Sequence, residues 1–150
     1  MAEREFDIIV YGATGYTGRL VAEHFVREYY GKPDAPKWAP RWAMAGRSLA
    51  KLQEVRDAIG APADTPLVIA DADDPASLEA MCNRTRVVLT TVGPYQLYGD
   101  ALVAACVRTG TDYADLCGEP VWMRQKIDEH MAAAEASGAH ICFSSGFDSI

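Results

Sequence analysis

Short apolar runs and longer amphipathic stretches take turns along almost the whole chain. Residues 6–11 form the first apolar run, and their β-branched and aromatic side chains are typical of a buried strand. Apolar residues then recur at helical spacing, which predicts a helix over residues 15–30. The predicted inner face of this helix consists of Leu20, Val21, His24 and Phe25.

The same alternation predicts the remaining elements. Further strands are expected at residues 41–45, 67–70, 86–91, 111–116 and 140–143. Helices are expected between them, at 48–59, from Pro75 onward, and at 99–109 and 120–136. Ser48 and Asp74 precede two of these helices and are typical N-cap residues. Leu52, Val55, Ile59 and Leu49 make up the predicted apolar face of the second helix.

Strands that alternate with helices favour a parallel sheet with helices on both faces. The predicted fold class is therefore α/β, a doubly wound parallel six-stranded sheet of the Rossmann NAD(P)-binding type. Ligands of such sheets bind beyond the carboxyl ends of the strands, so candidate site residues should directly follow each strand.

Three glycines follow the first strand in the pattern G-x-x-G-x-x-G. The turn and the start of the next helix comprise Gly12, Thr14, Gly15, Tyr16, Thr17 and Gly18. A bend without bulky side chains brings peptide N–H groups against a pyrophosphate, where the helix dipole favours negative charge. The alternative is a glycine-rich connection that binds no ligand. A Walker loop is excluded because no Lys follows these glycines.

The residues after the second strand bear on the choice of cofactor. In NAD-selective members of the fold an acidic residue stands there and binds the ribose hydroxyls. This chain has Arg47 followed by Ser48, a pair suited to a 2′-phosphate, with Arg19 as a further candidate. We therefore expect the cofactor to be NADP(H). The alternative is an Arg47 side chain that points into solvent.

Two more loops extend the predicted cofactor crevice. Asp71 and Ala72 follow the third strand and are expected near the adenine, although Asp71 could instead only stabilise the turn. After the fourth strand, the segment Val92, Gly93 and Pro94 is expected to bring backbone close to the ribose and nicotinamide.

Three side chains near that end of the crevice have two interpretations each. Tyr95 and Tyr98 could line the nicotinamide pocket or pack beneath the loop. Glu119, after the fifth strand, could lie near the reactive ring or complement the dipole of the following helix. Residues 144–147 follow the sixth strand and complete the expected crevice.

Composition narrows the range of partners. The chain has 150 residues, 14 Lys and Arg against 21 Asp and Glu, and a formal charge of −7, which disfavours nucleic acid and anionic membranes. Neither Cys nor His residues show metal-ligand spacing, so no metal site is expected. The four cysteines are interpreted as buried thiols in a reducing compartment. With no signal peptide and no apolar run of membrane length, the expected location is the cytoplasm.

The order of these motifs resembles a known family. The segments GATGYTGRLVAEH, AGRS, TVGPY, DYADLCGE and SSGFDS follow successive strands. Together they are similar to the N-terminal NADP-binding domain of saccharopine dehydrogenase-like oxidoreductases, which include bacterial trans-acting enoyl reductases. The resemblance implies hydride transfer, with enoyl reduction as one candidate reaction.

It also implies that residues 1–150 form the NADP-binding domain and that a substrate domain lies beyond residue 150. The expected partners are NADP(H), a small-molecule or lipid-like substrate of the full-length protein, and a second copy of the chain in a homodimer. No catalytic residue is assigned.

Other classes of protein share parts of this pattern. A short-chain dehydrogenase needs Tyr-x-x-x-Lys, which is absent. A semialdehyde reductase needs an active-site Cys on a further domain, and Cys142 within a strand is poorly placed. An NADP-binding redox sensor without catalysis of its own remains an alternative, because the chain shows no complete acid and base set.

Overall fold

The computed structural model describes residues 3–30 and 32–146, so residue 147 of the predicted crevice and the end of the SSGFDS motif lie outside the described residues. Its six parallel strands have the order β3-β2-β1-β4-β5-β6. The strands are β1 (Phe6–Tyr11), β2 (Trp42–Gly46), β3 (Leu67–Ile69), β4 (Thr85–Thr90), β5 (Asp112–Asp115) and β6 (Ile141–Cys142). The predicted fold class is confirmed.

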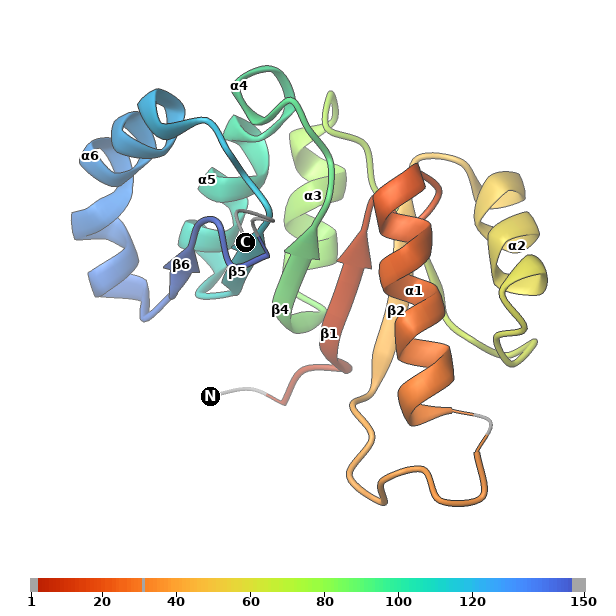
Figure 1. Ribbon diagram of the computed structural model, residues 1–150. Helices are drawn as coiled ribbons and strands as arrows, with labels where there is room; N and C mark the ends of the chain where they lie inside the picture. The colour runs from red at the N-terminus through yellow and green to blue at the C-terminus, as the bar shows by residue number, and fades with distance from the viewer. Residues whose placement is uncertain (1–2, 31, 147–150) are drawn as a thin grey trace.

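Helices cover both faces of this sheet (Figure 1). They are α1 (Tyr16–Tyr29), α2 (Leu49–Ala58), α3 (Pro75–Cys82), α4 (Tyr95–Tyr98), α5 (Asp100–Thr109) and α6 (Pro120–Ser137). One buried cluster joins α1 and α2 to the sheet, through Val10, Ala22, Phe25, Met44 and Leu52. The other joins α3 and α5 to the opposite face, through Ile9, Leu78, Val88, Val103 and Tyr113. β1 lies at the centre, since Ile9 pairs with Ala43 on one side and Val88 on the other.

Two helix starts confirm the predicted caps. The Ser48 hydroxyl accepts a hydrogen bond from the Lys51 backbone N–H at 3.4 Å, and the Asp74 carboxylate accepts one from the Ser77 N–H at 3.4 Å. Pro75 occupies the first turn of α3, where its missing N–H leaves no helical hydrogen bond unmade.

The predicted inner face of α1 is wrong in part. Phe25 is buried and stacks on Trp42 with ring centroids 5.2 Å apart, but Leu20 is 50% exposed and His24 is also exposed. Gly18 and Ala22 face the sheet instead. Small residues take these positions because the helix approaches the strand closely, a reason that a search for large apolar side chains overlooks. Leu49 at the start of α2 is likewise exposed.

The other differences lie at the far half of the sheet. The short helix α4 was not predicted, because four residues carry no periodic signal. β6 has only two residues, since Ser144 turns away with a φ of 57° and its N–H bonds the Asp115 carboxylate. Cys142 on this edge strand is exposed, whereas the other three cysteines are buried as expected.

Gly18 provides a test of the close approach between α1 and the turn after β1. A Cβ at Gly18 would lie 1.9 Å from the Gly12 carbonyl oxygen, a backbone atom that cannot easily move. We expect Gly18→Ala to lower the free energy of unfolding by about 3 kcal/mol, the upper end for overpacking. Urea denaturation measures this change.

Gly15→Ala is the matched control, because a Cβ at Gly15 would meet only the Gly12 oxygen, at 3.4 Å. A Gly18→Ala variant as stable as the parent would contradict the importance of this contact.

Candidate functional site: a dinucleotide crevice at the carboxyl edge

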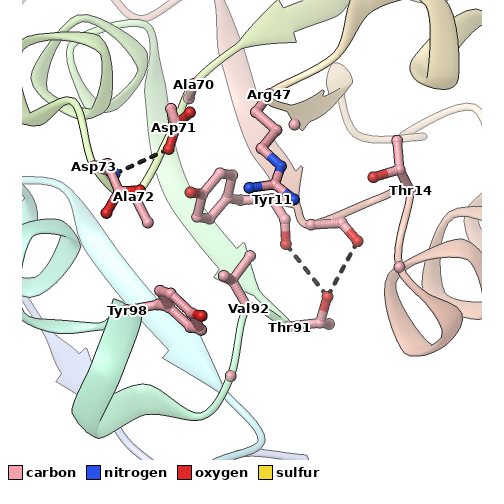
Figure 2. A pocket seen from close by; sticks show the side chains of 14 residues that line it. Tyr11, Thr14, Arg47, Ala70, Asp71, Ala72, Asp73, Thr91, Val92 and Tyr98 are labelled. Carbon is pink, nitrogen blue, oxygen red and sulfur yellow. Dashed lines mark hydrogen bonds between the residues drawn. The ribbon is translucent and has the colours of Figure 1, made fainter.

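A pocket of about 320 Å³ opens at the carboxyl ends of the central strands. Figure 2 shows its lining, which comes from the loops after β1, β2, β3 and β4. The lining residues are Tyr11, Gly12, Thr14, Gly15, Gly46, Arg47, Ala70, Asp71, Ala72, Asp73, Thr91, Val92, Gly93 and Tyr98. The pocket therefore lies where a doubly wound sheet binds its ligand.

Most of the predicted site residues meet in this pocket. Those that line it are Gly12, Thr14, Gly15, Arg47, Asp71, Ala72, Val92 and Gly93. Those outside the lining are Tyr16, Thr17, Gly18, Ser48, Pro94 and Tyr95. Tyr16 is 87% exposed, Gly18 is buried against the turn, and Ser48 caps α2.

Tyr95 does not line the pocket and packs in the core. Its side chain is 4% exposed, its hydroxyl donates to the Thr90 carbonyl at 3.2 Å, and its ring contacts Trp122. Of the two interpretations offered for Tyr95 and Tyr98, packing describes Tyr95 and pocket lining describes Tyr98.

Several lining residues were not among the predicted site residues. Tyr11 is the last residue of β1 and Thr91 directly follows β4, so each lies beside a predicted loop. Gly46, Ala70 and Asp73 also flank predicted residues. The only feature of the sequence that could have identified these residues is their position next to the carboxyl end of a strand.

The glycine turn is built from backbone hydrogen bonds and one positive dihedral angle. Gly12 has a φ of +90°, which favours glycine, and its N–H donates to the Ala45 carbonyl at 3.0 Å. The Gly15 N–H donates back to the Gly12 carbonyl at 3.0 Å. The Thr91 hydroxyl lies 3.4 Å from the carbonyl oxygens of Tyr11 and Gly12 (Figure 2). The turn is thus fixed from β2 and β4.

The first turn of α1 has no protein cap. Its N-cap residue is Gly15, and within residues 3–30 and 32–146 no side chain accepts a hydrogen bond from the first-turn N–H groups. No acidic residue stands in that turn. The uncapped start of α1, with the positive end of its dipole, therefore lies next to the pocket-lining residue Gly15, an arrangement that fits a phosphate.

Arg47 places a second positive charge at the pocket. Its side chain is exposed, and across the described ranges it forms no hydrogen bond or ion pair with another side chain. Figure 2 shows it reaching over the pocket beside the Tyr11 ring, with Asp71 and Asp73 on the other side of that ring. An unpaired guanidinium in this place fits a second phosphate of a dinucleotide.

Tyr11 lies between these charges. Burial, followed by the negative charge of Asp71, raises the pKa of Tyr11 to about 12, so the phenol stays protonated at neutral pH. The Asp71 carboxylate also accepts a hydrogen bond from the Asp73 N–H at 2.9 Å. Asp71 therefore both stabilises its turn and lines the pocket.

A buried carboxylate connects the loops at the far side of the crevice. Asp115, at the end of β5, is 3% exposed and accepts hydrogen bonds from the Tyr113 hydroxyl at 2.6 Å, the Cys117 N–H at 3.0 Å and the Ser144 N–H at 2.7 Å. Three donors satisfy this carboxylate and hold the loop after β5 against the loop after β6.

The described residues show neither a metal cluster nor a membrane span. No group of three or more His, Cys, Asp or Glu side chains among them could hold a metal ion. None of the helices in the described part of the chain is long and apolar enough to cross a membrane.

Comparisons with known proteins agree with this geometry. Residues 8–142 match the family model described as the saccharopine dehydrogenase NADP binding domain. A trans-acting enoyl reductase of Mycobacterium leprae (strain TN) is 52% identical over 149 residues, which cover 99% of this chain and 34% of the relative. The enzyme of that name from Mycobacterium ulcerans (strain Agy99) is 49% identical over 150 residues, with the same coverage. The chain spans about a third of the length of these relatives.

Solved structures show the same fold at low sequence identity. Apo saccharopine dehydrogenase (L-Glu forming) from Saccharomyces cerevisiae has a TM-score of 0.68 and 17% identity, over 95% of this chain and 28% of that one. Triphenylmethane reductase of Citrobacter sp., complexed with NADP(H), has a TM-score of 0.61 and 20% identity, over 92% and 48%.

The family model covers most of the chain, and relatives match almost all of it, so the resemblance predicted from the motifs is confirmed. The chain belongs to the saccharopine dehydrogenase NADP-binding domain family, and its cofactor is NADP(H).

Proposed function

We propose that the chain holds NADP(H) across the pocket, with Arg47 on the 2′-phosphate. The exposed, unpaired guanidinium at the end of β2 carries this proposal. NAD-selective domains have a carboxylate at that place, which would repel the 2′-phosphate, whereas a guanidinium binds it through charge-assisted hydrogen bonds. The Ser48 hydroxyl accepts the capping hydrogen bond of α2, and its O–H can still donate to the same phosphate.

The remaining contacts follow from the same orientation. In this proposal the pyrophosphate lies on the turn from Gly12 to Gly15, and the uncapped N–H groups of Tyr16 and Thr17 at the start of α1 donate to it. The adenine lies beside Asp71 and Ala72. The nicotinamide half then extends toward the loop after β4, over the residues Thr91, Val92, Gly93 and Tyr98.

We propose that the whole protein is an oxidoreductase, with enoyl reduction as the reaction favoured by its relatives' names. NADPH supplies a hydride in such reactions. The pocket residues of this chain bind and orient the cofactor. Groups that position and protonate the substrate would belong to a further domain. The length of the relatives, about three times that of this chain, supports such a domain.

The finer properties of the protein are proposals of the same kind. Its substrate is a small or lipid-like molecule, its location is the cytoplasm, and a homodimer is its proposed assembly. Gel filtration with light scattering of the full-length protein tests the last of these.

Gly15→Val tests the pyrophosphate site. The structure has room for a Cβ at Gly15, so the variant should fold, but its side chain occupies the place where the pyrophosphate approaches. We expect calorimetric titration with NADPH to show no binding. Ala136→Val, on the exposed part of α6, is the control. Equal affinity of a folded Gly15→Val variant and the parent would refute this site.

Arg47 tests the choice between the two cofactors. A hydrogen bond to a charged group contributes about 1.5 to 3 kcal/mol, which corresponds to a preference for NADPH over NADH of about ten- to a hundredfold. Arg47→Ala should remove most of this preference. Arg47→Asp should favour NADH, because the carboxylate repels the phosphate and accepts from the ribose hydroxyls.

Arg86→Ala is the matched control, since it removes one positive charge at the amino end of β4, away from the pocket. Titration of all four proteins with both cofactors decides the matter. If the parent binds NADH as tightly as NADPH, Arg47 plays no part in selection.

Measuring NADPH oxidation distinguishes the proposed oxidoreductase from a redox sensor without catalysis of its own. We expect residues 1–150 to bind NADPH without oxidising it in the presence of enoyl or carbonyl substrates, because the crevice is open to water. A chain extended to the length of the relatives should oxidise NADPH with such a substrate. Robust turnover by residues 1–150 would place the catalytic groups within this chain, and an inactive extended chain would favour the sensor.

A further inference from the structure

The short helix α4 is capped by a carboxylate from a different loop. Glu119, between β5 and α6, accepts hydrogen bonds from the backbone N–H groups of Tyr95 at 2.7 Å and Gln96 at 3.1 Å. Each carboxylate oxygen takes one of the two donors. Pro94, which precedes α4, makes no side-chain cap of its own. The start of α4 therefore depends on Glu119.

Glu119 caps α4 in preference to its own helix. It is the N-cap residue of α6, yet its side chain makes no hydrogen bond to the first turn of α6. Both of its oxygens instead bond the N–H groups of α4, 23 and 24 residues away in the chain. Of the two interpretations of Glu119, the dipole complement applies, but to a helix that the sequence did not reveal.

The capped helix carries one wall of the crevice. Val92 and Gly93 lead into α4 and Tyr98 ends it, and all three line the pocket. Figure 2 shows Tyr98 and Val92 on the same side of the pocket, across from Arg47 and Thr14. The position of α4 thus sets the position of this wall.

The loop that carries Glu119 is itself fixed. The Cys117 sulfur accepts a hydrogen bond from the Glu119 N–H at 3.3 Å, and the Cys117 N–H donates to the buried Asp115. Burial raises the pKa of the Cys117 thiol, so the sulfur adds no negative charge beside the Glu119 carboxylate at neutral pH. Through Glu119, the wall formed by α4 is therefore held by hydrogen bonds to the loop at the end of β5.

We propose that Glu119 is a positioning residue for the wall that receives the nicotinamide half of the cofactor. This inference rests on the proposed orientation of NADP(H). Without the cap, α4 and the loop before it would occupy the binding-competent arrangement for only a fraction of the time. The apparent affinity is then the intrinsic affinity multiplied by that fraction, and only for ligands that reach this wall.

Comparing two ligands, NADPH and adenosine 2′,5′-bisphosphate, distinguishes a change at the α4 wall from a change in the whole domain. We expect Glu119→Ala to weaken NADPH binding about tenfold, the equivalent of one charge-assisted hydrogen bond. Adenosine 2′,5′-bisphosphate lacks the nicotinamide half, so its affinity should change by less than about twofold. Glu119→Gln retains one acceptor and should fall between the parent and Glu119→Ala. Glu135→Ala, an exposed glutamate of α6, is the matched control.

Amide hydrogen exchange measures the cap without any ligand. Exchange at Tyr95 and Gln96 should be faster in Glu119→Ala and unchanged in Glu135→Ala. If Glu119→Ala does not fold, the ligand titrations and the exchange measurement are made on Glu119→Gln instead.

The outcomes are distinct. Equal weakening of both ligands, or unchanged affinity for both, would overturn the positioning role while the proposed cofactor site stands. A parent protein that binds neither ligand would overturn the proposed function and this inference together. A selective loss of NADPH affinity with faster exchange would establish Glu119 as the positioning residue.

Discussion

The contact between Gly18 and the Gly12 carbonyl determines how the rest of the crevice is arranged. A helix that starts this close to the end of β1 directs its free N–H groups into the space above the strand. Any side chain at Gly18 would push α1 outward and carry those donors with it. The same contact explains why small residues face the sheet along the first half of α1. The packing of α1 and the proposed phosphate site therefore both depend on one close approach.

The crevice has two halves that are built by different means. Beside β1, β2 and β3, the pocket is lined by the glycine turn, the exposed cation Arg47 and the segment from Asp71 to Asp73. On the side of β4 and β5, carboxylates hold loops in place: Asp115 joins the loops after β5 and β6, and Glu119 caps α4. Both carboxylates accept hydrogen bonds from protein donors, and these bonds offset the cost of removing the carboxylates from water.

The sequence predicted the elements of this fold well because strand and helix periodicities are local properties. It placed eight of the expected ligand residues in the pocket, since each directly follows a strand and parallel strands end at one edge. It could not place Tyr95, whose neighbour Trp122 is brought to it only by the packing of α6. Nor could it assign Glu119 to α4, because that contact depends on how two separate loops fold toward each other.

The exposure of Arg47 has a consequence for association in solution. The chain carries a formal charge of −7, so a polyanionic cofactor is repelled at long range and attracted by Arg47 only near the pocket. Added salt screens both effects, over a Debye length of about 8 Å at physiological ionic strength. Rising salt should speed the encounter while it weakens the proposed contact between Arg47 and the 2′-phosphate. For residues 1–150, faster association at high salt would therefore come with weaker discrimination between NADPH and NADH.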